Sequence, residues 1–455
     1  MRQYLYAVLL VELGGIASTA RATDIPTDLT WYGVTLYGIV DVGVSYQTHG
    51  SPLNSFYAQG LEYGISSNSN HSYSGGAPNG LSQSRVGLTG SHELASDWSS
   101  VFTLETRFSP LSGELADGPK SLTQNNGVRP ASQSSNSDSS QAGQVFTSAA
   151  FAGIKSGTYG KLTLGRQYGL LYDNILKYDP NDGAYAFSLI GFSAVAAGSG
   201  DSEYNRLAGS VKYTNQVGRF RIGAQYQPSA PTTGGVGEEF DLGTDWRQLS
   251  LDATYVDKHD AIALATFSPT AAQLAALIAK GLPLQDSLKA TLSNNKSGSL
   301  MARYDADRLK AYAGYEHIAF ANPDPGLNGI HVGSSTIGGY YVASITSNAY
   351  THQRILQVAW GGLKYSITPK LIVTGAVYHY DQNSYATGRT AGCSSRAASN
   401  CSGTEIAYSL VLEYQFNQYF DLYGGLLQSR VSGGLSSGFL NDSSTSTTTG
   451  IRVSF

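Results

Sequence analysis

The sequence predicts an all-β protein, a transmembrane antiparallel β-barrel of about sixteen strands with short periplasmic turns and long extracellular loops. Three observations lead to this prediction. Apolar and polar side chains alternate with a period of two along most of the 455 residues, and the spacers between the alternating segments are short and long in turn. The chain also contains 53 Gly and 31 Tyr but only 14% charged residues, against about 25% in soluble globular domains.

The first 22 residues have the three parts of a secretory signal peptide. Arg2 supplies the positive end, residues 4–16 form an apolar core interrupted by Glu12, and residues 20–22 (ARA) form a small-x-small cleavage site. We expect a signal peptide over residues 1–22 and a single barrel domain over residues 23–455. A short buried apolar segment is the alternative for the first 22 residues. No later stretch approaches the ~18 uninterrupted apolar residues of a spanning helix.

The segment VTLYGIVDVGVSYQ, residues 34–47, sets the strand pattern. Val40, Val42 and Val44 fall on one face, and Asp41 and Ser45 fall on the other. The same alternation recurs in SQSRVGLTGSHEL, WSSVFTLETRF, RLAGSVKYTN, RFRIGAQYQ, RQLSLDATYV, SLMARYD, LKAYAGYE, ILQVAWGGLKYSI, LIVTGAVYHY, EIAYSLVLEYQF and FDLYGGLLQSR. These segments are the predicted strands.

The spacers between these segments alternate in length. Short ones such as SGTYG, NQVG, DADR, ITPK and NQY take turns with long stretches rich in Gly, Ser and Asn. We expect the long loops at residues 48–81, 109–145, 168–204, 227–246, 268–296, 318–352, 382–403 and 430–446. One stretch inside them, residues 270–292, has helical spacing and predicts a helical insertion, with an irregular loop as the equal alternative.

A soluble β-sandwich also alternates, so the two architectures have to be distinguished. A sandwich buries its apolar faces between two sheets and seldom needs many long loops at one end. Here aromatic residues stand at strand ends on the apolar face, as in the girdle of a membrane barrel. They are Tyr46, Trp98, Phe108, Tyr213, Tyr226, Tyr255, Tyr304, Tyr414 and Phe416. The membrane barrel is therefore the prediction.

The last residues, GIRVSF, read as the strand that closes this barrel. Ile451, Val453 and Phe455 share one face, while Arg452 and Ser454 share the other. Unpaired strand edges cannot lie in a bilayer, because each unmet backbone group costs several kcal/mol. We therefore expect the last strand to pair with the first, with its apolar residues facing lipid.

Two cysteines, Cys393 and Cys401, lie in the polar stretch GCSSRAASNC. In an exported chain, two thiols at this spacing predict a disulfide within one loop, and two free surface thiols are the alternative. A metal site is not expected, because no His or third Cys is near them and the 8 histidines are scattered.

The face opposite the apolar one carries Thr, Ser, Gln and ionisable residues. Such a face is not expected to pack a dry core, and a barrel of about sixteen strands leaves an aqueous channel. The residues expected to line this lumen include Tyr37, Asp41, Glu105, Arg107, Lys212 and Arg221. A net charge of −4 without a lysine-rich run gives no footprint for nucleic acid. Transport of water-soluble molecules is the predicted function class.

Several segments resemble the general porins of the Gram-negative outer membrane. They are VTLYGIVDVGVSY, SRVGLTGSHEL, YGKLTLGRQYGLLYD, RLAGSVKYTN and the terminal GIRVSF, of which GRQYGLLYD is the most specific. The resemblance implies a homotrimer of sixteen-stranded barrels in a membrane that contains lipopolysaccharide. It also implies that the terminal aromatic residue, here Phe455, is the assembly signal read by the outer-membrane barrel assembly machinery.

In these porins the third external loop folds into the lumen and narrows it, with arginines on one wall and carboxylates on the loop. By resemblance the loop is residues 168–204. Its partners are Arg85, Arg166 and Arg206 on the wall, and Asp173, Asp179 and Asp182 on the loop. Strict alternation would turn Arg166 toward lipid beside Leu162 and Leu164, so we expect a bulge or loop onset after Gly165 to aim it inward.

The resulting prediction is a channel for passive diffusion of ions and small hydrophilic solutes, without a cofactor. A substrate-specific channel is one alternative, and a surface barrel that acts in adhesion or recognition through its loops is another. An enzyme is not predicted. The stretch GLSSG, residues 434–438, fits G-x-S-x-G but lies in a Ser/Gly-rich loop without the strand-to-helix turn that exposes a nucleophile.

Overall fold

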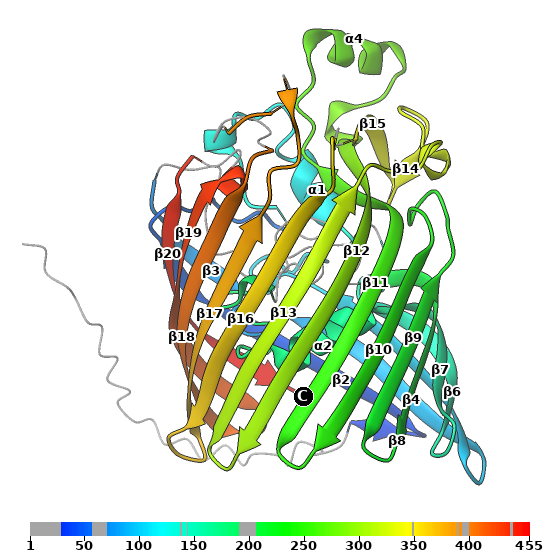
Figure 1. The fold of residues 1–455 in the computed structure, drawn as a ribbon, viewed down its shortest axis with the longest axis vertical. Coiled ribbons are helices and arrows are strands. Elements are labelled where there is room, and N and C mark those ends of the chain that lie inside the picture. The colour runs from blue at the N-terminus through cyan, green and yellow to red at the C-terminus, as the bar shows by residue number, and fades with distance from the viewer. Residues whose placement is uncertain are drawn as a thin grey trace, which may run out of the picture.

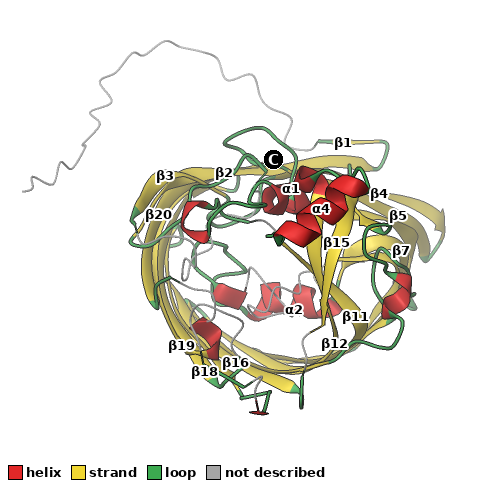
Figure 2. Ribbon diagram, turned by 90° about the horizontal axis from the view of Figure 1, so that it is seen from above, coloured by secondary structure: helices red, strands yellow, loops and turns green. Residues whose placement is uncertain are grey.

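The computed structural model describes residues 29–56, 71–136, 139–142, 144–190, 206–347, 350–388, 391–393, 400–436 and 440–455. Its strands form one closed antiparallel barrel, seen from the side in Figure 1 and from above in Figure 2. The predicted fold class is therefore confirmed. The predicted signal peptide, residues 1–22, lies outside the described residues.

Sixteen of the described strands make up the barrel wall. In chain order they are β2 (Val34–Gln47), β4 (Arg85–Ala95), β5 (Trp98–Arg107), β6 (Ala149–Ser156), β7 (Gly160–Tyr168), β8 (Arg206–Val217), β9 (Phe220–Gln227), β10 (Gly237–Trp246), β11 (Leu249–Ala265), β12 (Ser287–Ala306), β13 (Leu309–Ala321), β16 (Arg354–Ser366), β17 (Leu371–Gln382), β18 (Gly403–Asn417), β19 (Phe420–Gly433) and β20 (Ser443–Ser454). Each pairs with the next, and β20 pairs with β2.

The seam between β20 and β2 includes the last residue. Ile39 lies opposite Ser454, and Gly38 and Phe455 exchange two backbone hydrogen bonds with N–O distances of 3.0 and 3.1 Å. The ring of Phe455 lies over Gly38, where an added Cβ would come within 2.3 Å of a ring carbon. A glycine at this position therefore makes room for the terminal aromatic ring.

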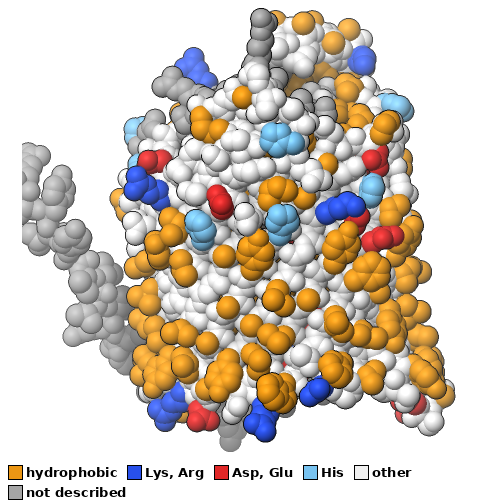
Figure 3. All heavy atoms as spheres, in the orientation of Figure 1, with side chains coloured by type: hydrophobic (Ala, Val, Ile, Leu, Met, Phe, Trp, Pro, Cys, Tyr) orange, Lys and Arg blue, Asp and Glu red, His pale blue; other side chains and the backbone are white. Residues whose placement is uncertain are grey.

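The outer surface of the barrel is apolar. On the face shown in Figure 3, hydrophobic side chains form a broad band, with charged and histidine side chains above it and further charged ones at its lower edge. Most of the girdle aromatics named from the sequence are exposed on this surface, namely Tyr46, Tyr226, Tyr255, Tyr304, Tyr414 and Phe416. This is the outer surface of a strand-built membrane protein. Among the described residues, no helix is long and apolar enough to cross a bilayer.

One predicted loop is wrong. Residues 227–246 were expected to be a long loop, but β10 occupies residues 237–246 and pairs with β9 and β11. Phe240 and Leu242 point outward and are exposed, while Glu239 is buried on the lumen side. The density of acidic residues in GEEFDLGTDW hides this alternation. Glu239, Asp241 and Asp245 alternate onto the lumen face, whereas Glu238 is exposed on the outer face at the start of the strand.

The helical insertion is shorter than the expected range of 270–292. Helix α4 covers Ala271–Ala279 and begins with a capping box between Thr270 and Gln273. It ends ahead of Pro283, which cannot continue a helix. Strand β12 then starts at Ser287, so residues 287–292 are strand and not helix.

Loop elements form a roof over part of the extracellular mouth (Figure 2). Helix α1 (Gly118–Thr123) and the short strands β14 (Thr336–Ile337) and β15 (Tyr340–Ser347) belong to it, and β15 runs parallel to the upper part of β12. Its buried apolar cluster contains Leu122, Ile262, Leu264, Leu288, Ala290, Leu292, Ile330, Ile337 and Val342. Two remaining short strands, β1 (Thr30–Trp31) and β3 (Tyr73–Pro78), both pair with β2.

The loop between β17 and β18 contains a disulfide between Cys393 and Cys401, whose Cα atoms are 5.3 Å apart. The two cysteines predicted from the sequence to pair are thus bonded in the structure.

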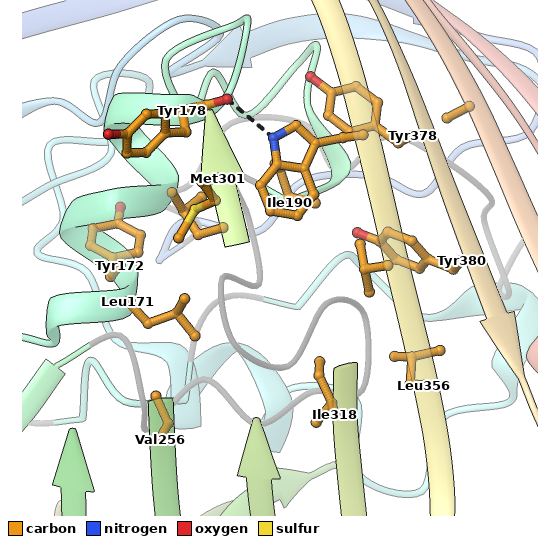
Figure 4. Close-up of a cluster of buried hydrophobic side chains, with 14 of the residues drawn as sticks. Leu171, Tyr172, Tyr178, Ile190, Val256, Met301, Ile318, Leu356, Tyr378 and Tyr380 are labelled. Atoms are coloured by element: carbon orange, nitrogen blue, oxygen red, sulfur yellow. Dashed lines mark hydrogen bonds between the residues drawn. The ribbon is translucent and has the colours of Figure 1, made fainter. Parts of the chain in front are cut away.

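The barrel lumen contains an apolar core, contrary to the expectation that its polar face could not pack one. Inward side chains of the wall pack against the loop that follows β7 (Figure 4). The wall supplies Val256, Met301, Ile318, Leu356, Val358, Trp360, Tyr378 and Tyr380. On these strands both faces carry apolar residues, one for lipid and one for the loop, so strict alternation underestimates the buried area.

Candidate functional site

The loop between β7 and β8 enters the lumen and is seated there by helix α2 (Leu170–Tyr178). Figure 2 shows α2 inside the ring of strands. Leu171, Ile175 and Tyr178 recur at helical spacing, are fully buried or nearly so, and face the apolar wall. The indole Nε1 of Trp360 donates to the Tyr178 carbonyl at 3.1 Å, the dashed contact in Figure 4. The part of the predicted 168–204 loop that is described is therefore fixed against one side of the barrel.

Polar contacts from α2 to β10 and β11 add to this attachment. The amide Nδ2 of Asn174 donates to Asp241 at 2.7 Å and to Thr254 at 2.8 Å. Lys177 pairs with Asp252 at 2.8 Å, and its position in the last turn also favours the negative end of the helix dipole. Helix α2 is therefore held to the wall by both apolar and charged groups.

The three carboxylates predicted for the constriction occupy different environments. Asp173 is half exposed and pairs with Lys212 at 2.5 Å, and Asp182 is largely exposed and pairs with Lys364. Both carboxylates therefore lie at the surface of the loop, each balanced by a lysine from the barrel wall.

Asp179 is fully buried and lies inside the loop rather than on its channel surface. It accepts hydrogen bonds from the Tyr378 hydroxyl and the Gly183 amide, both at 2.8 Å. Burial raises the pKa of the Asp179 carboxyl to about 6, although these hydrogen bonds lower it in part. The geometry gives Asp179 a part in holding the loop to β17.

Arg85 is partly exposed on the barrel wall. Its side chain is 30% exposed, and its Nε lies 3.3 Å from Glu105 Oε2. The hydroxyl of Tyr37 donates to the same oxygen at 2.9 Å. Arg85, Glu105 and Tyr37 thus come together on the lumen face of β2, β4 and β5.

Arg206 is buried in a stack that the sequence did not predict. Its guanidinium and that of Arg107 both lie against the ring of Tyr168, with the guanidinium carbons 5.4 and 5.5 Å from the ring centroid. The Tyr168 hydroxyl bonds to Arg107 and donates to Glu105 Oε1 at 3.1 Å. Arg107 and Arg206 are only 3% and 2% exposed, so neither presents its charge directly to the channel.

Arg166 lies at an irregularity in β7. The pairing of β7 with β8 shifts register between Gly165 and Gln167, and Gly165 has φ +135°, a backbone conformation that favours glycine. The guanidinium donates to the Thr147 carbonyl at 2.8 and 3.0 Å and to the Ser140 carbonyl at 2.6 Å. Arg166 is therefore directed to the second external loop, which it ties to the wall.

Asp41 and Arg221, two further residues expected to line the lumen, are also committed to partners. Asp41 is buried and accepts from the Leu81 and Ser82 amides at 2.9 and 2.7 Å and from the Tyr423 hydroxyl at 2.6 Å. Arg221 pairs with Asp252 at 2.9 Å and also with Asp245. Both residues face inward, but Asp41 holds the backbone of Leu81 and Ser82 in place and does not line the open part of the lumen.

Sequence reasoning missed the groups that position the loop. Tyr168, Trp360 and Tyr378 each join a charged or backbone group of the site to the wall. The only available signal was the inward register of Trp360 and Tyr378, which places large aromatics where a porous lumen would need small polar residues. Across the described ranges, no group of three or more His, Cys, Asp or Glu side chains is placed to hold a metal ion.

The chain is similar to known outer-membrane porins. Residues 7–434 match the family model described as Gram-negative porin. An outer membrane porin protein of Bordetella pertussis is 28% identical over 261 residues, which is 57% of this chain and 51% of that protein. The chain therefore aligns with about half the length of this curated relative.

Solved structures with the same fold cover almost the whole chain. The anion-selective porin from Comamonas acidovorans has a TM-score of 0.58 at 16% identity, over 93% of this chain and 99% of that one. The trimer form of OmpT from Vibrio cholerae has a TM-score of 0.55 at 12% identity, over 93% and 99% of the two chains. At these identities the likeness establishes the fold. Taken with the family match, it places the chain in the Gram-negative porin family of outer-membrane β-barrels.

Proposed function

We propose that the protein forms a water-filled channel for passive diffusion of ions and small hydrophilic solutes across the outer membrane. The observation that carries this proposal is the sixteen-stranded barrel, apolar outside, with α2 seated against one side of its lumen. A barrel of this size leaves an aqueous path unless its interior is filled. The proposal involves no enzymatic step and no cofactor.

The constriction is proposed to lie between Arg85 on the wall and the exposed loop carboxylates Asp173 and Asp182. These three charges are exposed or partly exposed, whereas Asp179 and Arg206 are buried and Arg166 is bonded to carbonyls of the second external loop. Opposed charges across a narrow throat create a transverse field that favours polar over apolar solutes. Arg107, Arg166 and Arg206 would support this wall by holding Tyr168 and the second loop in place.

Zero-current potentials across a salt gradient in a planar bilayer test this constriction. Arg85→Gln should shift permeability toward cations and Asp182→Asn toward anions, and both shifts should shrink near 1 M salt, where the Debye length is about 3 Å. Arg430→Gln is the matched control, because Arg430 is exposed on the outer face of β19. Unchanged potentials for both lumen variants would mean that the constriction lies elsewhere.

We further propose a homotrimer that associates through the wall of short strands. Strands β5, β6, β7 and β9 contain 8 to 10 residues, whereas β11 and β12 contain 17 and 20. This wall of short strands exposes Ile154, Leu162 and Leu164 outward, and Leu88 of the neighbouring strand β4 is also exposed. A relative solved in a trimer form has the same fold, which supports this assembly. Crosslinking through cysteines placed on β6 would test it.

Recognition by the extracellular roof is the second candidate function. Helix α4 favours it, since Ile278 is 69% exposed and Leu277 is the helix's only buried residue. Liposome swelling separates the two functions. Uptake of small sugars that falls with sugar size supports the channel, whereas absence of uptake by membrane-inserted protein supports recognition.

A further inference from the structure

Two lysines face each other on the lumen side of β6 and β7, in the wall of short strands. Lys155 on β6 lies directly opposite Lys161 on β7 in the strand pairing. Their neighbours Ile154 and Leu162 point outward and are exposed, so the alternation turns both lysines inward. Directly opposed side chains have Cβ atoms about 4.5–5.5 Å apart, and like charges in this arrangement destabilise a sheet. The pair therefore concentrates positive charge near the periplasmic end of the lumen.

The lysine pair lies between two cavities. One of ≈ 470 Å³ is bounded by both lysines, by Asp173 of the constriction loop and by the polar residues Thr214 and Gln216. The other, of ≈ 330 Å³, is bounded by both lysines and by hydroxyl side chains of β2, β4 and β5, namely Thr35, Thr89 and Thr103. Both ammonium groups are accordingly reachable by a small solute in the lumen.

Other directly opposed cations of the barrel have carboxylates beside them. Lys310 lies opposite Lys364. Lys310 pairs with Asp305 at 4.0 Å, and Lys364 pairs with Asp182. Arg85 lies opposite Arg107, with Glu105 at 3.3 Å from Arg85. Like charges are thus normally balanced within this wall.

Lys155 and Lys161 have no such partner among the described residues. The acidic groups that bound the same cavity are already engaged, since Asp173 pairs with Lys212 at 2.5 Å and Asp241 accepts from Asn174 at 2.7 Å. The two ammonium groups, with six N–H donors between them, therefore have no bonded carboxylate of their own among the described residues.

We propose that Lys155 and Lys161 form an anion-binding subsite in the periplasmic vestibule, suited to a small dianion such as inorganic phosphate or a dicarboxylate. Two adjacent ammonium groups match two negative charges, and Thr214 and Gln216 offer further hydrogen bonds. The inference rests on the proposed channel function, and it places the subsite on the periplasmic side of the constriction. A dianion that passes α2 would be held there briefly before release.

Calorimetric titration of the folded protein in detergent with inorganic phosphate at low salt tests the subsite. Removal of both ammonium groups in Lys155→Gln/Lys161→Gln should weaken binding by about tenfold, since each exposed charge interaction contributes up to ~1 kcal/mol. The control Lys310→Gln/Lys370→Gln removes two periplasmic-side lysines that bound neither cavity and should bind as the unmodified protein does. Equal affinity of the vestibule double variant and the unmodified protein, or no binding by the latter, overturns the inference.

Planar-bilayer conductance in KCl separates this inference from the proposed function. Conducting protein that does not bind phosphate refutes the subsite and leaves the channel proposal standing. Protein that binds phosphate through these lysines but does not conduct supports the subsite and refutes the channel. Conduction together with lysine-dependent binding supports both.

Discussion

Replacing Ile175 with alanine tests whether the apolar core inside the lumen holds the constriction loop. Ile175 is fully buried between α2 and the wall. The change removes three carbon atoms at about 0.8 kcal/mol each and leaves a cavity, so the seated loop should lose about 3 kcal/mol. Because about 1.4 kcal/mol corresponds to a tenfold change, the population of the released loop should rise by roughly 100-fold.

Hydrogen exchange of the folded protein in detergent measures this release. The amides of Asp173 and Asp179 are bonded within the helix, to the carbonyls of Gly169 and Ile175 at 3.1 and 2.9 Å, and they should exchange roughly 100-fold faster in the variant. The matched control is Ile278→Ala in the exposed helix α4, which should leave exchange in α2 unchanged. An acceleration of less than about fivefold in Ile175→Ala would mean that this core does not hold the loop.

Three further predictions concern the seam, the disulfide and pH. Deletion of Phe455 or the change Gly38→Val, which would clash with its ring, should lower the yield of heat-modifiable, membrane-inserted barrel; normal yields would contradict the role of the seam. Reduction of the Cys393–Cys401 disulfide should destabilise the protein by about 2–3 kcal/mol at most, and mass spectrometry of envelope protein should find both thiols bonded. Burial raises the pKa of Asp179 from 3.8 to about 6, so the seated loop binds a proton more tightly than the released one. The protection of the amides of residues 183–190 from hydrogen exchange, corrected for intrinsic rates, should therefore be highest below about pH 4. It should fall as the pH rises to about 6 and stay level above that pH. Protection that rises between pH 4 and 6 would contradict the burial of Asp179.

The sequence predicts the barrel well because the side chain of each wall residue faces either lipid or the lumen, and the residue type usually indicates which. Alternation identifies most strands, and the terminal Phe455 predicts the closing strand. Strand β10 was missed because its lumen face is acidic, so that GEEFDLGTDW has the composition of a loop. Helix α4 was expected at about its place, but the capping residues and Pro283 end it earlier than its composition suggests.

The loop inside the lumen was harder to predict, because its contacts join residues far apart in the chain. Resemblance located the loop, and Gly165 correctly drew attention to an irregularity beside Arg166. Whether a loop carboxylate is buried or exposed could not be predicted from its residue type. Asp173 and Asp179 are six positions apart in one motif, yet one is exposed and the other is enclosed against Tyr378. The stack of Arg206 on Tyr168 likewise depends on two strands and a loop coming together.

Single-channel recording in a planar bilayer tests the central proposal most directly, that solutes pass through an aqueous path beside α2. Purified, folded protein should produce stepwise current increments whose conductance rises almost in proportion to KCl concentration, as expected for ions that move through water. Ile175→Ala should add current fluctuations to these steps, because its loop is released more often. Protein that inserts as a folded barrel but gives no current steps at any salt concentration would contradict the proposed channel.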